Sequence, residues 1–194
     1  MLQRARWIRL GLVGPLELHA ACAGLAAAQA RDAEPIVLWA QARAYLSDEQ
    51  QYAFAVIAPR RLAPGRPARW FAWALSPAIA TYREYGLRAY LNGTDVWLHG
   101  RKIAGCSAAT IGGCAVIASS FPVDLPAAHA ETPPERALEA ALRARIEAQY
   151  GWQFDSAWPG EAEQAAIAEA RADRFVGRVE PAAMRPRFLE SYGW

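Results

Sequence analysis

Closely spaced turn signals between residues 87 and 119 place the strongest limit on how this chain can fold. Asn92-Gly93, His99-Gly100 and Ile111-Gly112-Gly113 separate short runs of strand-forming residues. Short turns of the Asn-Gly type join antiparallel strands. We therefore expect strands at 87–91, 96–98, 102–109 and 114–119, joined as hairpins.

Helical patterns lie on both sides of these strands. Pro15 and Glu17 are suited to the first turn of a helix running to residue 30. Further helices are expected at 74–85, ended by Gly86, at 135–150, ended by Gly151, and at 160–175. Thr132-Pro133-Pro134-Glu135 has the pattern of a capping box. Apolar runs predict strands at 36–40, 52–57 and 152–154.

Composition excludes several classes of protein. Hydrophobic residues are 54% and charged residues 21% of the 194, so the chain is not disordered. A net charge of +2 does not indicate a nucleic-acid partner. No apolar run reaches the ~18–20 residues of a membrane span, so no membrane partner is expected. The three cysteines and three histidines lack zinc-site spacing, and we expect no metal ligands and reduced, buried thiols in a cytoplasmic protein.

The first 30 residues allow two interpretations. Arg4, Arg6 and Arg9 precede an apolar stretch, and Ala28-Gln29-Ala30 has the form of a signal-peptidase site. Exported protein cleaved after Ala30 is therefore the alternative to a cytoplasmic one. Pro15, Glu17 and His19 interrupt the apolar stretch, which favours a helix of the mature fold.

Lys102 is the single lysine beside 20 arginines. With 44 alanines, this bias indicates a GC-rich genome, in which a surface cation tends to become arginine. A lysine that survives is suited to a place where a compact, mobile charge is needed. Chance survival is the alternative.

The stretch from Gly93 to Gly105, GTDVWLHGRKIAG, resembles the catalytic hairpin of the lipoate–protein ligase and biotin–protein ligase superfamily. These enzymes join a lipoyl, octanoyl or biotinyl carboxylate to a lysine of a carrier domain. The resemblance extends by element order over residues 15–177 and implies an α/β fold, with a mixed, largely antiparallel sheet flanked by helices. It implies one domain over 1–177, with residues 178–194 as a tail.

The resemblance also implies roles for individual residues. Lys102 would be catalytic, stabilising charge where the acyl carboxylate meets the α-phosphate. Residues that match the family's substrate and nucleotide contacts are Asp95, Gly100, Arg101, Gly105 and Gly113. ATP and Mg²⁺ would be used by an active ligase, with lipoate or octanoate as the acyl group. A lipoyl- or biotinyl-type carrier protein would be the partner.

Three departures from the family pattern leave activity open. The Arg-Arg-x-(Ser/Thr)-Gly-Gly-Gly stretch that holds the phosphates is missing between residues 41 and 51. Thr94 replaces the asparagine of the family's Asn-Asp pair, and Gly113-Cys114 stands where His-Gly is usual. Cys106 and Cys114 are expected to be buried small residues rather than acyl-accepting thiols.

Two classes of function follow. The first is a ligase or acyltransferase acting on a carrier lysine. The second is a non-catalytic protein of the same fold that binds a carrier domain or completes a site with a second subunit. The basic loop at 59–69 is either a solvated surface or a contact with an acidic partner, through Arg60, Arg61, Arg66 and Arg69.

Overall fold

The computed structural model describes residues 2–29, 33–43, 50–122 and 134–176. Its eight strands are β1 (Gln3–Val13), β2 (Ile36–Arg43), β3 (Gln50–Pro59), β4 (Tyr90–Asn92), β5 (Asp95–Leu98), β6 (Arg101–Ile111), β7 (Cys114–Pro122) and β8 (Trp152–Ala157). The helices are α1 (Pro15–Ala28), α2 (Trp70–Glu84), α3 (Glu135–Tyr150) and α4 (Glu161–Val176), with a 3₁₀ turn, η1, at Pro67–Arg69.

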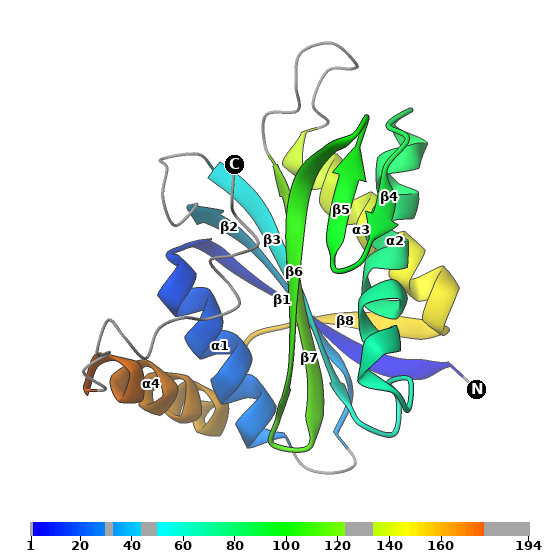
Figure 1. The fold of residues 1–194 in the computed structure, drawn as a ribbon. Coiled ribbons are helices and arrows are strands. Elements are labelled where there is room, and N and C mark those ends of the chain that lie inside the picture. Colours follow the sequence, from blue (N-terminus) through cyan, green and yellow to red (C-terminus); the bar gives the residue numbers. More distant parts are fainter. Residues whose placement is uncertain (1, 30–32, 44–49, 123–133, 177–194) are drawn as a thin grey trace.

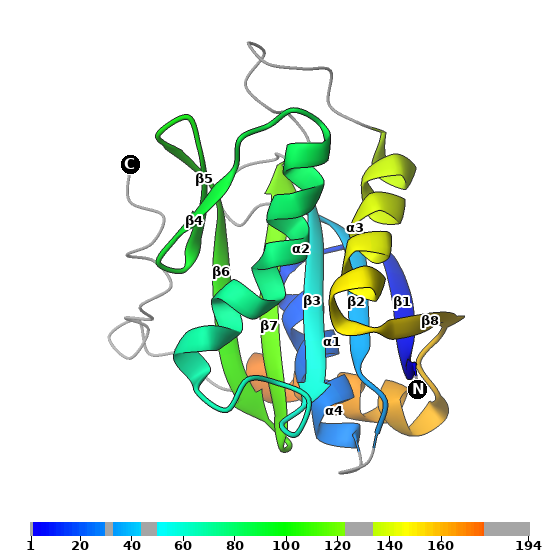
Figure 2. The same ribbon diagram turned by 90° about the vertical axis from the view of Figure 1, so that its right-hand side faces the viewer.

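The strands form one sheet in the order β4-β5-β6-β7-β3-β2-β1-β8. β1 pairs in parallel with β2 and with β8, whereas the other five pairings are antiparallel. Helices α1 and α4 lie on one face of the sheet, and α2 and α3 on the other (Figures 1 and 2). The expected α/β fold with a mixed, largely antiparallel sheet is confirmed.

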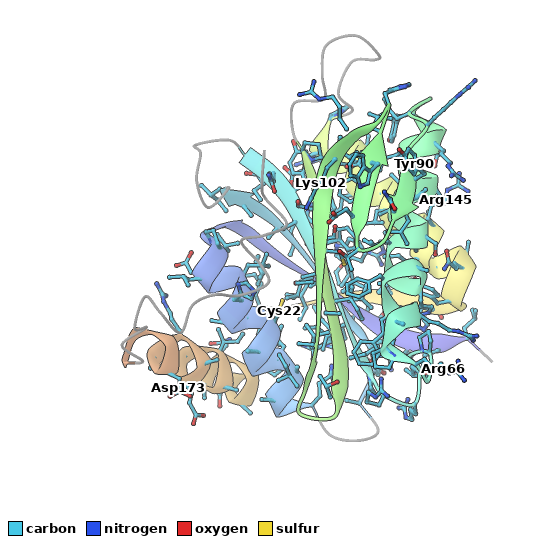
Figure 3. All side chains as sticks on the ribbon, in the orientation of Figure 1. Cys22, Arg66, Tyr90, Lys102, Arg145 and Asp173 are labelled. Carbon is cyan, nitrogen blue, oxygen red and sulfur yellow. The ribbon has the colours of Figure 1, made fainter. Side chains whose placement is uncertain are left out.

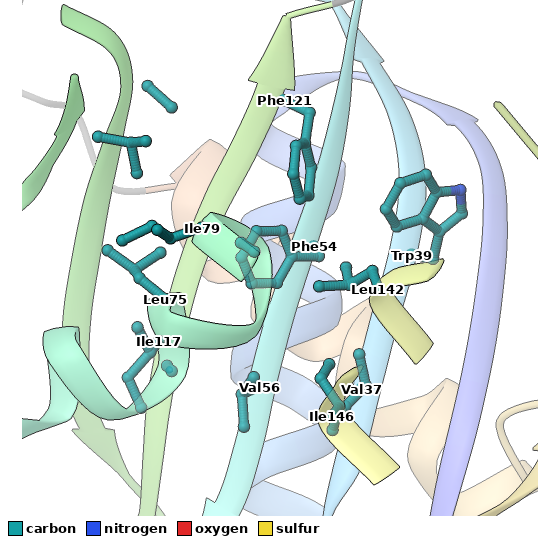
Figure 4. Packing of buried hydrophobic residues seen from close by; sticks show 14 of the residues in the cluster. Val37, Trp39, Phe54, Val56, Leu75, Ile79, Ile117, Phe121, Leu142 and Ile146 are labelled. Atoms are coloured by element: carbon teal, nitrogen blue, oxygen red, sulfur yellow. The ribbon is translucent and has the colours of Figure 1, made fainter. Parts of the chain in front are cut away.

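Each face of the sheet has its own apolar core. Side chains of α2 and α3 pack with one set of alternating strand residues, among them Trp39, Phe54 and Phe121 (Figure 4). Leu25 of α1 packs with Ile36, Ile57 and others of the opposite set. The period-2 alternation along β2, β3 and β7 therefore supplies both cores from the same strands.

Residues 3–13, which the sequence left as the start of a possible leader, form strand β1. Ala5, Trp7 and Ile8 are buried in it. The arginines that suggested a leader pair with carboxylates far along the chain: Arg4 with Asp155, Arg6 with Glu163 and Arg9 with Glu135. Local sequence cannot reveal these partners, and for this reason the strand was not predicted. Cleavage after Ala30 would remove β1 from the sheet and α1 from one of its faces.

Helix α1 begins at Pro15, as predicted, and the Glu17 carboxylate accepts a hydrogen bond from the Gly14 N–H. It packs tightly against α4. A Cβ on Gly24 would lie 2.4 Å from the backbone nitrogen of Ile167. Glycine at this position is what lets the two helices approach so closely.

Several predicted boundaries move. α2 begins at Trp70 rather than at 74. The strand expected at 87–91 is β4 at 90–92. The apolar residues Leu87 and Ala89 that suggested its earlier start are instead buried in the connection between α2 and β4. The capping box is wrong. α3 begins at Glu135 with Pro134 as its N-cap, and the Glu135 carboxylate instead accepts hydrogen bonds from β1 and β2. Thr132 and the predicted tail at 178–194 lie outside the described residues.

Gly86 and Gly151 occupy left-handed conformations just after α2 and α3, with φ of +76° and +65°. Both predicted helix ends are therefore confirmed.

Candidate functional site

The β5–β6 hairpin turns through two left-handed residues. His99 has φ +50° and Gly100 has φ +76°, the conformation that a tight hairpin requires at both central positions. The predicted hairpin is thereby confirmed. It fixes Lys102 as the second residue of β6, directly after the exposed Arg101.

A β-bulge sets which side chains share a face of this hairpin. Trp97 pairs with Lys102, but the next pair is Val96 with Ala104, so Ile103 has no opposite residue. Directly opposed residues point to the same face of a sheet. Lys102 therefore shares a face with Trp97, and so does Asp95, two residues along β5. Val96 and Ala104 are buried on the opposite face, toward the core beneath α2.

Lys102 and Asp95, two of the predicted site residues, form an ion pair that the sequence did not predict. Lys102 Nζ lies 3.1 Å from Asp95 Oδ1, and the side chains are 22% and 21% exposed. Asp95 Oδ1 is buried, and it has no partner with hydrogen-bond geometry in the described structure. The contact is thus electrostatic, and the carboxylate keeps a lone pair that a ligand or water can use.

Strand β6 changes partners beside this pair. From Arg101 to Gly105 it pairs with β5, and from Cys106 onward it pairs with β7. The Ser119 hydroxyl donates to the Gly105 carbonyl at 2.9 Å where the pairing changes. Beyond that point the end of β7 pairs with β3 alone. Lys102 consequently stands on an arm of β6 that has left β7, and in Figure 1 this arm leans toward β5.

The two cysteines of β6 and β7 do not have the properties of nucleophiles. Burial raises the pKa of the Cys106 thiol to about 12, and the charge of Asp95 adds to the effect. Burial also raises the pKa of Cys114, whose thiol lies 3.2 Å from Gln29 Oε1. Both thiols are therefore protonated at neutral pH, which supports the expectation that they are packing residues.

The remaining predicted residues lie at the other end of β6. Gly113 is in the β6–β7 turn, where its carbonyl accepts a hydrogen bond from the Arg60 N–H. An 11-residue strand separates this turn from Gly100, about 35 Å at ~3.3 Å per residue. Figure 3 shows Lys102 and Arg66 at opposite ends of the molecule. The structure therefore brings Asp95, Gly100, Arg101 and Gly105 together with Lys102, but not Gly113 or the basic loop.

The basic loop is folded around Trp70. The Arg60 guanidinium lies 4.5 Å from the centre of the Trp70 ring, and the indole donates to the Pro64 carbonyl. Arg61, Arg66 and Arg69 are exposed. The loop is a surface feature in its own right, separate from the Lys102 hairpin.

A carboxylate pair on α3 was not predicted. Glu135 accepts hydrogen bonds from Arg9, Trp39 and Gln41 at 2.5, 3.2 and 2.6 Å, and Glu139 accepts one from Trp7 at 2.8 Å. Burial alone would raise the pKa of Glu135, but these hydrogen bonds outweigh it and lower the pKa. The i, i+4 spacing of the two glutamates was the available signal, although it is also common on exposed helix faces.

Metal ligands and membrane spans are not found in the described part of the chain. No group of three or more His, Cys, Asp or Glu side chains there is placed to hold a metal ion. None of the helices over the same residues is both long and apolar enough to cross a bilayer.

Solved structures with this fold include lipoate protein ligases and a protein, Ta0514, described as a candidate lipoate protein ligase. Ta0514 from T. acidophilum aligns with a TM-score of 0.71 and 13% identity, over 88% of this chain and 95% of that one. A bi-partite lipoate protein ligase from Thermoplasma acidophilum, solved in a study of that ligase and its E2 lipoyl domain, gives 0.68 and 13% over 88% and 92%. Lipoate-protein ligase A bound with ATP gives 0.68 and 14% over 88% and 95%.

Biotin ligases are similar at greater distance. The biotin acetyl coenzyme A carboxylase synthetase from Helicobacter pylori, with bound biotinylated ATP, aligns with a TM-score of 0.51 and 14% identity over 76% of this chain and 75% of that one. No family model and no curated protein sequence matches. The chain therefore has the fold of lipoate and biotin protein ligases, as its Lys102 hairpin led us to expect.

Proposed function

We propose that this protein binds an activated lipoyl or octanoyl group and transfers it to a lysine of a lipoyl-type carrier domain. The observation that carries the proposal is the Lys102–Asp95 pair on the arm of β6 that has left β7, within a lipoate ligase fold. An ammonium in this partly buried position is suited to oxygen atoms that gain charge during acyl transfer.

The transfer step is aminolysis of an acyl-adenylate. The carrier lysine, as a neutral amine, attacks the carbonyl carbon of an acyl-adenylate, forming an amide C–N bond. The bond from that carbon to the phosphate oxygen breaks, AMP leaves with the electron pair, and the amine loses a proton to water. Lys102 would stabilise the carbonyl and phosphate oxygens, and Asp95 would hold Lys102 in place.

Formation of the adenylate from ATP is the step for which this chain is least equipped. Only residues 44–49 separate β2 from β3, and the sequence there holds no glycine to surround phosphates. We infer that a second protein supplies the missing part, as the bi-partite nature of the T. acidophilum ligase suggests.

A two-stage assay tests this division. With ATP, Mg²⁺ and octanoate or lipoate, pyrophosphate release by the chain alone should stay near background. With preformed octanoyl-adenylate and an E2 lipoyl domain, the mass of the carrier should increase by one octanoyl group, faster than without the protein. Absence of any enhancement would contradict the proposal.

The second candidate is a non-catalytic protein of this fold that binds a carrier domain. It is favoured by the same lack of a phosphate-binding stretch. Tight binding of the lipoyl domain without enhanced transfer from octanoyl-adenylate would select this alternative.

A further inference from the structure

Trp97 lies at the centre of a row of three side chains that crosses the β4–β5–β6 strands. On one side it is directly opposite Tyr90, and on the other it is directly opposite Lys102. Opposed residues share a face, so all three point away from the core beneath α2. Figure 3 labels the two ends of this row, Tyr90 and Lys102, near the same end of the molecule.

The indole nitrogen of Trp97 is buried and has no hydrogen-bond acceptor in the described structure. A buried N–H without an acceptor is costly, and native proteins rarely retain one unless a ligand, ion or water satisfies it. Three tryptophans of the core show the usual arrangement: the indoles of Trp7, Trp39 and Trp70 each donate to a carboxylate or carbonyl.

The surroundings of this N–H indicate what it would bind. It shares a face with the ammonium of Lys102, and both groups can only donate hydrogen bonds. Two donors on one face are suited to an oxygen anion. Asp95, on the same face, contacts Lys102 through Oδ1, and neither this oxygen nor the indole nitrogen has a hydrogen-bond partner in the described structure.

We infer that Trp97 is a ligand-binding residue, whose indole N–H donates to the anionic oxygen that Lys102 attracts. This inference rests on the proposed function. The ligand group is an acyl carboxylate or the α-phosphate of an acyl-adenylate, which share this chemistry. Lys102 would attract the oxygen by its charge, and the indole N–H would fix the position of that oxygen through a directional hydrogen bond.

The experiment compares Trp97→Phe with Trp158→Phe by calorimetry. The first removes the N–H but keeps an aromatic ring, and the second changes a tryptophan that is 66% exposed. Octanoate serves as the carboxylate probe and octanoyl-sulfamoyl-adenosine as the adenylate probe. We expect Trp97→Phe to weaken binding roughly tenfold or more, as for a hydrogen bond to a charged acceptor, for whichever probe the wild type binds. Trp158→Phe should bind like the wild type.

A second measurement reports on the N–H directly. In protein labelled with ¹⁵N at tryptophan, the indole signal missing from Trp97→Phe should shift when the wild type binds its probe. Trp97→Tyr gives the same assignment should the Phe variant not fold. Wild-type affinity in Trp97→Phe, or an unmoved Trp97 signal in the bound wild type, would overturn the inference and leave the proposed function standing. Failure of the wild type to bind either probe would remove both.

Discussion

At the scale of single residues, the ion pair of Lys102 with Asp95 determines what substitutions at this site can show. Each side chain is about one-fifth exposed, so removal of one charge leaves the other partly buried and uncompensated. Loss of function and loss of stability are therefore coupled for deletion of the lysine. A substitution that keeps the charge separates the two effects.

We expect Lys102→Arg to melt within a few degrees of the wild type but to slow transfer from octanoyl-adenylate about tenfold or more. A planar guanidinium keeps the pairing with Asp95 yet does not fit a site shaped for an ammonium. Lys102→Ala should lose activity and also about 1–3 kcal/mol of stability. Calorimetric melting and the carrier mass assay measure the two quantities.

The matched control is Arg88→Ala, which removes an exposed cation shortly before β4. It should change neither the melting temperature nor transfer. Unchanged transfer by Lys102→Arg and Lys102→Ala would show that Lys102 is an ordinary hairpin residue.

At the scale of elements, the packing of α1 on α4 depends on a missing side chain. Ala in place of Gly24 would put a Cβ 2.4 Å from the nitrogen of Ile167 and 2.7 Å from the carbonyl carbon of Ala166. These are backbone atoms, which cannot move aside alone. The helices must separate, and Leu25, fully buried beside Gly24, would move with α1.

We predict that Gly24→Ala lowers the free energy of unfolding by about 1–3 kcal/mol, the usual cost of overpacking. Helix propensity alone predicts the reverse, a gain of up to ~1 kcal/mol. Gly65→Ala is the control, because no atom lies within 4 Å of its added Cβ and its φ is not left-handed. Chemical denaturation distinguishes the two effects, and a stabilised Gly24→Ala would refute the close packing.

What the sequence predicted at this scale depended on whether the determining contacts are local. The turns at Asn92-Gly93 and His99-Gly100 and the helix end at Gly151 follow from neighbouring residues, and these predictions are confirmed. β1 was missed because its arginines find their carboxylates more than 120 residues away.

Residues of the candidate site were likewise predicted where local sequence indicates them and missed where their partners are remote. Lys102 stood out by composition and by its hairpin. Trp97 was not predicted, because it lies in the apolar run Val96-Trp97-Leu98 and a sequence pattern does not indicate whether an indole N–H has an acceptor. Glu135 was interpreted as a capping residue because its true partners, on β1 and β2, are remote.

At the scale of the whole molecule, carboxylates of α3 and α4 connect both helical layers to the sheet. Hydrogen bonding to Arg6 lowers the pKa of Glu163, as hydrogen bonds from Arg9, Trp39 and Gln41 lower that of Glu135. A carboxylate with a lowered folded pKa contributes stability above its unfolded pKa, ~4.3, and loses it as pH falls through the folded pKa.

We therefore expect the stability advantage of the wild type over Glu163→Gln to be full at pH 7 and to shrink as the pH falls below about 4. Glu161→Gln, at an exposed position two residues earlier, is the control and should show a smaller dependence. Urea denaturation at several pH values measures both. A difference that stays constant from pH 7 to pH 3 would contradict the role of Glu163.

Deletion of residues 1–30 tests the place of the first strand and helix. β1 lies between β2 and β8, and α1 covers one core, so the truncated chain should not give a cooperative melting transition. The expected loss is comparable to the ~5–15 kcal/mol total stability of a domain. A truncated protein that is soluble, with the melting temperature of the full chain, would instead support a removable leader.

The parallel pairing of β1 with β8 also has a consequence during synthesis. In the register of these two strands Arg6 lies opposite Asp155. The edge of β1 that faces β8 therefore has no partner strand until 149 more residues have been made. At ~5–20 residues per second, that edge remains open on the ribosome for roughly 7–30 s. Throughout that interval the nascent sheet exposes unpaired N–H and C=O groups, beside which Arg4 still lacks Asp155 and Arg6 still lacks Glu163. Charged side chains at an open strand edge disfavour pairing with another chain. The two arginines therefore hinder aggregation during synthesis, before they form ion pairs in the finished fold.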